Sequence, residues 1–259
     1  METNIFNFNR LGLLFQRYFT ERFHTELIYW GIMVIVFMFI RNIPPLMVML
    51  MLIAGIFYAS RFFREIHSPG NGVAYFMIPA TQLEKLTVGI VMTSFYYLVM
   101  MIIVYITGNL FGTFLNNMLA STNIFGFNIF HHSQLQWKLF ENIDYMDPAD
   151  TIRRIKYPVL FATIFLYTQS IYLLGSIYFK RNQFLKTFLS VNITGLLLLI
   201  LYIIELWLVF GNINANRFAN VEFPANWDAI LYYIMQIGLI LLTLFFWVVS
   251  YFRLTEKQV

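Results

Sequence analysis

The sequence predicts an all-α polytopic membrane protein with six transmembrane helices, and two observations predict this class. First, 59% of the 259 residues are hydrophobic and only 12% are charged, whereas a water-soluble domain has about 25% charged residues. Second, six stretches of the chain are apolar over roughly the 20 residues that a helix needs to cross about 30 Å of hydrocarbon. We therefore expect a single transmembrane domain built from helices.

The predicted spans divide residues 24–259 into helices and connecting segments. The first two spans are joined only by RNIPP, which predicts a tight helical hairpin because proline suits the first turn of a helix. Segment 109–156 is too polar to cross the membrane and is predicted to be an extracytoplasmic loop. The six spans are expected at residues 24–41, 44–63, 86–108, 157–179, 185–210 and 228–252.

Residues 1–23 predict an amphipathic helix at the membrane surface. A cleavable signal peptide would have a basic region, an apolar core and a small-residue cleavage site, and this pattern is absent from the stretch. Apolar residues recur at helical spacing, and charged residues occupy the other side. A helix that packs against the protein is the alternative. The apolar residues are Leu11, Leu14, Phe15, Tyr18 and Phe19, and the charged ones are Arg10, Arg17 and Glu21.

The distribution of lysine and arginine among the loops predicts that both termini lie in the cytoplasm. An even number of spans places the two termini on one side, and short cytoplasmic loops carry the excess of basic residues. With the termini inside, 11 of the 17 basic residues are cytoplasmic. These are Arg10, Arg17, Arg22, Arg61, Arg64, Lys85, Lys180, Arg181, Lys186, Arg253 and Lys257.

The polar segment REIHSPGNGVAYFMIPATQLEKL, residues 64–86, then faces the cytoplasm. Ser68 followed by Pro69 predicts an N-cap and the first position of a short helix that ends before Pro79. Thr81 and Glu84 match a capping box that begins the third span. The short helix would expose an apolar surface formed by Val73, Tyr75, Phe76, Met77 and Ile78. Gly70 and Gly72 each weaken this helix by about 1 kcal/mol relative to alanine, so we expect it to order only on docking.

With this segment, the chain resembles the membrane subunits of type-2 ABC exporters, especially small permeases of Bacteroidota. The resemblance lies in the pattern EIHSPGNGVAYFMIPATQLEK, in the tail YFRLTEKQV and in the order of the predicted helices. It covers nearly the whole chain, but only residues 65–85 and the tail are motif-like. It implies a bacterial cytoplasmic (inner) membrane location and a second permease subunit, in a homodimer or heterodimer.

The resemblance also implies that the short cytoplasmic helix docks into a groove of a separate ATP-binding subunit and transmits its closure. ATP and magnesium would then be bound by that partner, and this chain would need no cofactor of its own. A bare connector or an unrelated interface is the alternative for this segment. The coupling residues implied are Glu65, Ser68, Pro69, Tyr75, Phe76, Met77, Pro79 and Glu84.

Motifs for other chemistry are absent from the sequence, which predicts that the chain is not an enzyme. It has no G-x-x-x-x-G-K-[ST] phosphate loop, no H-E-x-x-H and no G-x-S-x-G. It also has no cysteine and no dense basic block, which excludes cysteine-based metal sites and gives no sign of nucleic-acid binding. One acidic cluster with two adjacent histidines predicts a solvated loop rather than a metal site, because adjacent side chains point apart. Its members are His131, His132, Glu141, Asp144, Asp147 and Asp150.

Glu205 is the intramembrane polar candidate. An ionisable residue inside a span is costly in hydrocarbon and is a functional candidate by default. Glu205 precedes Gly211 by six residues, or about 9 Å along a helix, so its side chain can also reach the interface. Two interpretations of Glu205 remain. It has a role in the transport pathway or between helices, or it simply lies at the membrane interface.

The function expected is therefore that of a permease subunit that exports a hydrophobic or amphipathic solute, with export implied by the resemblance alone. The scarcity of charge within the spans favours an apolar path for the cargo. Two alternatives belong to other classes. One is a membrane scaffold or sensor that does not transport, and the other is a membrane-embedded enzyme that uses His131 and His132.

Overall fold

The computed structural model describes residues 6–40, 44–68, 70–122, 148–210 and 227–257, and these residues form helices without strands. The prediction of an all-α fold is confirmed. The helices are α1 (Phe8–Ile40), α2 (Pro44–Arg61), the 3₁₀ helix η1 (Arg64–His67), α3 (Asn71–Phe76), α4 (Gln82–Ile90), the π-helix η2 (Val91–Tyr96), α5 (Tyr97–Thr122), α6 (Pro148–Tyr178), α7 (Gln183–Phe210) and α8 (Trp227–Glu256).

Five helical stretches of the described chain are long and apolar enough to cross a membrane. A sixth, within α2, is apolar but shorter. With 18 residues, α2 is roughly 27 Å long, slightly less than the usual hydrocarbon thickness. The five stretches are Phe8–Ile40, Gln82–Leu115, Val159–Tyr178, Gln183–Glu205 and Ile230–Glu256.

The helices extend further than the predicted spans, and the loop expected at residues 109–156 is partly helical. α5 continues to Thr122, and α6 begins at Pro148, so both enter the segment expected to be a loop. A polar sequence argues against burial in hydrocarbon, but it does not prevent a helix from continuing into water. Residues 123–147, which contain His131 and His132, lie outside the described part of the chain.

The predicted boundary between residues 23 and 24 falls within one continuous helix, α1. Near its start, the apolar side of α1 packs against the protein itself. Leu14, Phe15 and Tyr18 are partly buried against a cluster that includes Phe62 and Phe63. Contacts within the chain therefore cover part of the apolar side of this segment.

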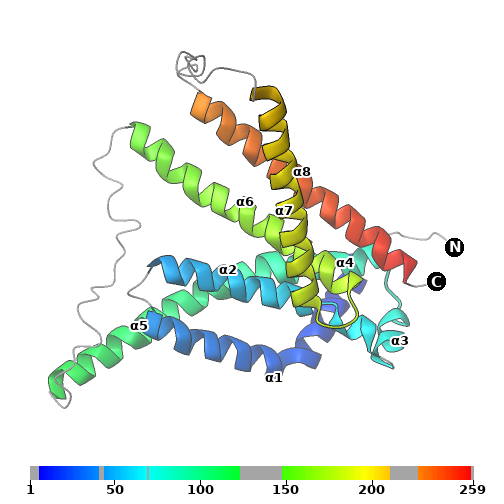
Figure 1. The fold of residues 1–259 in the computed structure, drawn as a ribbon. Coiled ribbons are helices and arrows are strands. Elements are labelled where there is room, and N and C mark those ends of the chain that lie inside the picture. Colours follow the sequence, from blue (N-terminus) through cyan, green and yellow to red (C-terminus); the bar gives the residue numbers. More distant parts are fainter. Residues whose placement is uncertain (1–5, 41–43, 69, 123–147, 211–226, 258–259) are drawn as a thin grey trace.

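Three close helix pairings hold the long helices together (Figure 1) and leave α7 largely uncovered. α6 packs against α8 and α2, and α1 packs against α5. Trp30, Phe37, Tyr97 and Phe165 are the large residues of the core between α1, α2, α5 and α6. Beyond its first turns α7 is exposed on all sides as far as Glu205, which suits contact with lipid.

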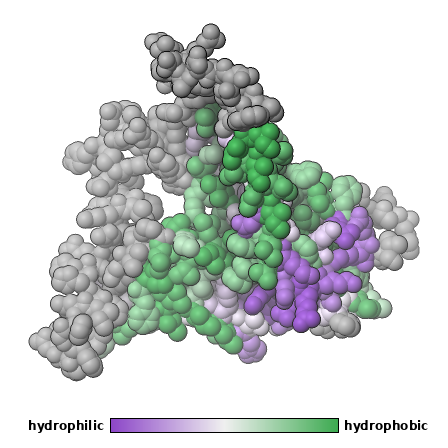
Figure 2. All heavy atoms as spheres, in the orientation of Figure 1, coloured by the Kyte–Doolittle hydropathy of each residue, from purple (hydrophilic) through white to green (hydrophobic). Residues whose placement is uncertain are grey.

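Hydrophilic residues gather at one end of the molecule, which we call the polar end (Figure 2). It comprises η1, α3, the start of α4, the turn between α6 and α7, and the last residues of α8 (Figure 1). His67 of η1 contacts both the end of α6 and Lys257: its Nε2–H donates to the carbonyl of Ser176 at 3.0 Å, and the Lys257 Nζ lies 3.2 Å from its Nδ1. The polar end thus joins segments that are far apart in the sequence.

Candidate functional site

The candidate site is the short helix α3 and the residues that hold it at the polar end. The chain turns between η1 and α3 at Gly70, whose φ of 84° suits only glycine well. Gly72 is also required, because a Cβ atom there would lie 2.6 Å from the carbonyl oxygen of Ile66. Both glycines therefore allow the tight turn, whereas the sequence suggested only that they weaken the helix.

Ser68 does not cap α3, which corrects the predicted helix start. α3 begins at Asn71, and Gly70 is its N-cap residue. Ser68 instead ends η1, where its hydroxyl donates to the carbonyl of Glu65 at 2.8 Å. The turn at Gly70 separates the two short helices, and Ser68 precedes this turn, so its side chain cannot cap α3. Pro69 lies outside the described residues.

Two aromatic side chains of α3, Tyr75 and Phe76, point into the protein. The Tyr75 ring lies edge-on to Phe63, with 6.3 Å between ring centroids. The Lys85 Nζ lies 5.3 Å from the Tyr75 ring centroid and 5.8 Å from that of Phe76. Burial raises the pKa of the Tyr75 phenol well above its ordinary value. Both rings are partly buried and anchor α3.

Lys85 was predicted only as a cytoplasmic charge, and the structure places it beneath α3. It is 1% exposed, and its ammonium donates to the carbonyl of Phe76 at 3.4 Å. A buried ammonium is costly unless it is paired, and here two aromatic rings supply cation–π contacts. Lys85 therefore fixes the end of α3 on α4, the beginning of the third predicted span.

The outer side of α3 exposes apolar side chains. Val73 is 58% exposed and Met77 is 77% exposed. Pro79, in the turn that follows, is also exposed. Of the predicted coupling residues, Met77 and Pro79 thus lie where a partner can reach them.

Glu84 is an internal anchor. The predicted capping box is confirmed, because the Glu84 carboxylate accepts the backbone N–H of Thr81 at 2.8 Å while its own N–H donates to the Thr81 hydroxyl. The same carboxylate accepts the backbone N–H of Asn7 at 2.8 Å and pairs with Arg10 at 3.0 Å. The Glu84 side chain is fully buried, so it cannot contact a partner docked on this surface.

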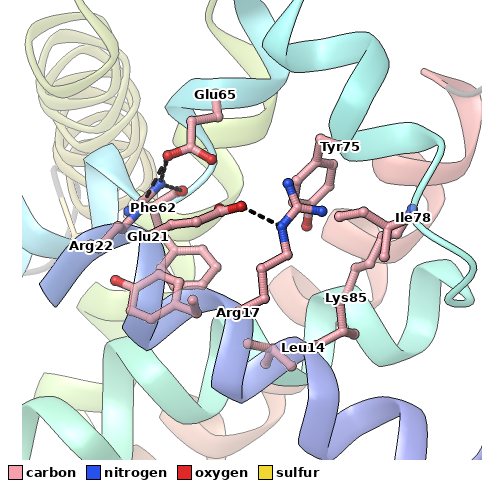
Figure 3. A pocket seen from close by; sticks show the side chains of 11 residues that line it. Leu14, Arg17, Glu21, Arg22, Phe62, Glu65, Tyr75, Ile78 and Lys85 are labelled. Atoms are coloured by element: carbon pink, nitrogen blue, oxygen red, sulfur yellow. Dashed lines mark hydrogen bonds and ion pairs between the residues drawn. The ribbon is translucent and has the colours of Figure 1, made fainter.

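Glu65 connects η1 to α1. The Arg22 guanidinium lies 2.7 Å from the Glu65 carboxylate and also donates to the carbonyl of Phe62 at 3.2 Å. It is held over the Tyr18 ring, 4.9 Å from its centroid. Figure 3 shows Arg22, Phe62 and Glu65 on one side of a pocket and Tyr75 on the other, and Tyr18 also lines this pocket. α1, η1, α3 and α4 therefore meet at one set of contacts.

The sequence reasoning missed Glu26, an acidic residue within the first predicted span. Its carboxylate is buried and accepts from three donors: the Trp30 indole at 2.9 Å and the hydroxyls of Tyr18 and Tyr58 at 3.1 Å each. A carboxylate with several donors is stable away from water. The sequence did contain one sign of this contact, because Glu26 and Trp30 are separated by one helical turn.

The remaining candidates lie away from this site. Glu205 is exposed on α7, and the 22 residues that separate it from the start of α7 correspond to about 33 Å of helix. Asp150 belongs to α6, whereas the other members of the acidic cluster fall outside the described residues. Within the described part of the chain, no group of three or more His, Asp and Glu residues is placed to hold a metal ion.

Comparison with known protein families, curated proteins and solved structures finds no match to this chain.

Proposed function

We propose that this chain is the membrane subunit of an ABC exporter, driven by a separate ATP-binding subunit. In this proposal six helices cross the bacterial inner membrane, with α2 as the short second span and α4, η2 and α5 together as the third. One observation carries the proposal. α3 is fixed on its inner side by Tyr75, Phe76 and Lys85 and exposes Val73 and Met77 on its outer side. Such a helix can both bind a partner and transmit its movement.

The arrangement of charge supports a cytoplasmic polar end. Arg61, Arg64, Lys180, Arg181 and Lys257 all lie there. Alternating spans would bring these loops to one side of the membrane, and short basic loops are typical of the cytoplasmic side. Both termini would then be cytoplasmic, and an ATP-binding subunit would meet α3 where ATP is available.

The contacts of α3 also support transmission to the membrane. Movement of α3 would act on α4 through Lys85, since that side chain is packed beneath the Tyr75 and Phe76 rings. It would act on α1 through η1, because Glu65 is paired with Arg22. Two spans would therefore respond to one docking event. A second permease subunit, identical or related, would complete the transporter.

Co-purification tests this proposal. The tagged protein is isolated from gently solubilised native membranes, and bound proteins are identified by mass spectrometry. We expect an ATP-binding subunit to accompany the wild type and to be lost when Val73→Asp and Met77→Asp are combined. The matched control combines Val73→Ile with Met77→Leu, which keeps both exposed side chains apolar and should keep the partner.

The alternatives give different results. A partner that binds through Val73 and Met77 without ATP-dependent flux in reconstituted vesicles would favour a scaffold or sensor. Activity of the purified chain alone, lost when His131 or His132 is changed, would favour an enzyme. If no ATP-binding subunit is found under conditions that preserve membrane complexes, the proposed function is wrong.

A further inference from the structure

A second feature of the polar end is a basic groove between the end of α2, η1 and the turn from α6 to α7. Its volume is about 550 Å³. Four cationic side chains line it, namely Arg61, Arg64, Lys180 and Arg181, and no described residue that lines it is acidic. All four residues are exposed, and none takes part in the ion pairs found among the described residues. We call this feature the basic groove.

The carboxylates that line a groove together with these cations are engaged by other groups. A neighbouring groove on the α1 side shares Arg61, Arg64 and Lys180 and also contains acidic residues. Of these, Glu21 is paired with Arg17 and Glu65 with Arg22, and Glu26 accepts the Trp30 indole N–H at 2.9 Å. The positive charge of the basic groove is therefore left for a ligand from outside the chain.

The start of α7 adds to the attraction for an anion. α7 begins at Gln183, directly after Asn182, whose φ of 55° turns the chain into the helix. Gln183, Phe184 and Leu185 of this first turn line the basic groove. The first backbone N–H groups of a helix have no partner within it, and they favour negative charge.

An apolar wall adjoins the cations. The rings of Phe57 on α2 and Phe184 on α7 stack with their centroids 4.0 Å apart and an angle of 15°. Leu185 is 51% exposed, and the exposed apolar surface continues along α7 through Phe188 and Leu189. In Figure 2 a hydrophobic column over α7 meets the hydrophilic patch near the start of this helix. A soluble anion would use only the charged part of this surface.

We propose that the basic groove binds the phosphate headgroup of an anionic phospholipid, whose acyl chain lies along the apolar side of α7. Arginine binds phosphate with two parallel hydrogen bonds, and basic pockets between membrane helices on the cytoplasmic side suit anionic lipid headgroups. The phosphate would be held by Arg61, Arg64, Lys180 and Arg181. This site requires only that α7 lies in a membrane, so it does not depend on the proposed transport function.

Thermal unfolding of the detergent-purified full chain tests the site with three probes: dioctanoyl phosphatidylglycerol, dioctanoyl phosphatidylcholine and inorganic phosphate. A ligand that binds the folded state raises the melting temperature as its concentration rises. We expect phosphatidylglycerol to do so and the other two probes to have little effect. Combined Lys180→Gln and Arg181→Gln should weaken phosphatidylglycerol binding by about a hundredfold, because each of the two lost charged hydrogen bonds contributes about tenfold.

A matched control removes two positive charges elsewhere. Arg153 and Arg154 lie near the start of α6, at the opposite end of this helix from Lys180, so combined Arg153→Gln and Arg154→Gln changes the net charge equally away from the basic groove. The control should bind phosphatidylglycerol like the wild type. An equal loss of phosphatidylglycerol binding in the control would assign the effect to general charge and overturn the site. An equal rise in melting temperature with phosphatidylcholine or with inorganic phosphate would also overturn it.

A second measurement leaves all four cations in place. The chain has no cysteine, so Leu185→Cys provides one attachment point for a fluorophore beside the basic groove. In reconstituted bilayers, brominated phosphatidylglycerol should quench this fluorophore more strongly than brominated phosphatidylcholine at the same mole fraction. Equal quenching by the two lipids would contradict selective binding, even if the variant at Lys180 and Arg181 fails to fold.

Discussion

The side chain of Arg10 forms a 3.0 Å ion pair with Glu84, a residue with no exposed surface. This contact joins the first helical turn of α1 to the start of α4. The same carboxylate also binds the backbone of Asn7 and Thr81. The N-terminal helix is therefore fastened to the third predicted span, next to the end of α3.

Removing the Glu84 carboxylate should destabilise the protein. Glu84→Ala would remove the capping interaction and leave the backbone N–H groups of Asn7 and Thr81 without this acceptor. We expect the free energy of unfolding to fall by about 2–4 kcal/mol, from the loss of a cap and of charged hydrogen bonds. Glu21→Ala, which breaks the exposed pair with Arg17, should cost less than about 1 kcal/mol. Equal effects in chemical denaturation would contradict the anchoring role of Glu84.

Gly55 should tolerate a methyl group only if Gln169 is shortened. A Cβ atom at position 55 would lie 2.5 Å from the Gln169 Nε2 and 3.0 Å from the Tyr97 ring. Overpacking of this kind costs about 1–3 kcal/mol, so Gly55→Ala should lower the melting temperature. The combination of Gly55→Ala with Gln169→Ala should cost less than the sum of the single changes. Additive losses would show that α2 and α6 do not approach each other as described.

Mild acid should destabilise the contact between η1 and α8. Burial lowers the pKa of His67 below its ordinary value, and the positive charges of Lys257 and Lys180 act in the same direction. Between the lowered pKa and about 6.5 the unfolded chain binds more protons than the folded one, so stability falls as the pH is lowered through this window. Burial lowers the pKa of Lys257 to about 8, so this ammonium is still mainly charged there.

The measurement is the melting temperature between pH 7.5 and 5 for the wild type and for His67→Gln. Glutamine can still donate to the carbonyl of Ser176, which the His67 ring contacts at 3.0 Å, but it does not titrate. The melting temperature of the wild type should therefore fall more steeply with acid. Parallel curves for the two proteins would rule out a contribution from His67.

The proposed topology predicts opposite accessibility at the two ends of the spans. Single cysteines are introduced by Ala74→Cys, in α3, and by Asn216→Cys, in the segment between α7 and α8. In intact cells, a membrane-impermeant maleimide should label the second and leave the first unlabelled. Labelling of both from outside, or of Ala74→Cys alone, would exclude a topology with six spans and cytoplasmic termini.

Local sequence patterns predicted the helices and one contact of the site. The capping box of Thr81 and Glu84 was predictable because its partners are only three residues apart. The helical class was predictable because apolar stretches of span length leave few other folds. The actual start of α3 was not predictable from such patterns, since it depends on the positive φ of Gly70.

These local patterns could not predict the contacts between segments that are distant in the sequence. The sequence suggested an exposed apolar surface that included Tyr75 and Phe76, but the direction of these rings depends on Phe63 and Lys85 from neighbouring helices. The burial of Glu84 likewise depends on α1, whose Arg10 comes 74 residues earlier in the numbering. An amphipathic pattern defines which residues differ in polarity, but not which element covers them.

Site-directed crosslinking at α3 tests the central claim most directly. Because the chain has no cysteine, Met77→Cys carries one photoactivatable crosslinker on the outer side of α3, and Phe63→Cys places the same group in the buried cluster beneath it. In native membranes, we predict that Met77→Cys forms an adduct with a protein that contains a G-x-x-x-x-G-K-[ST] phosphate loop, while Phe63→Cys does not. Adducts of Met77→Cys that contain only lipid or proteins without this loop would contradict the proposal that α3 couples this chain to an ATP-binding subunit.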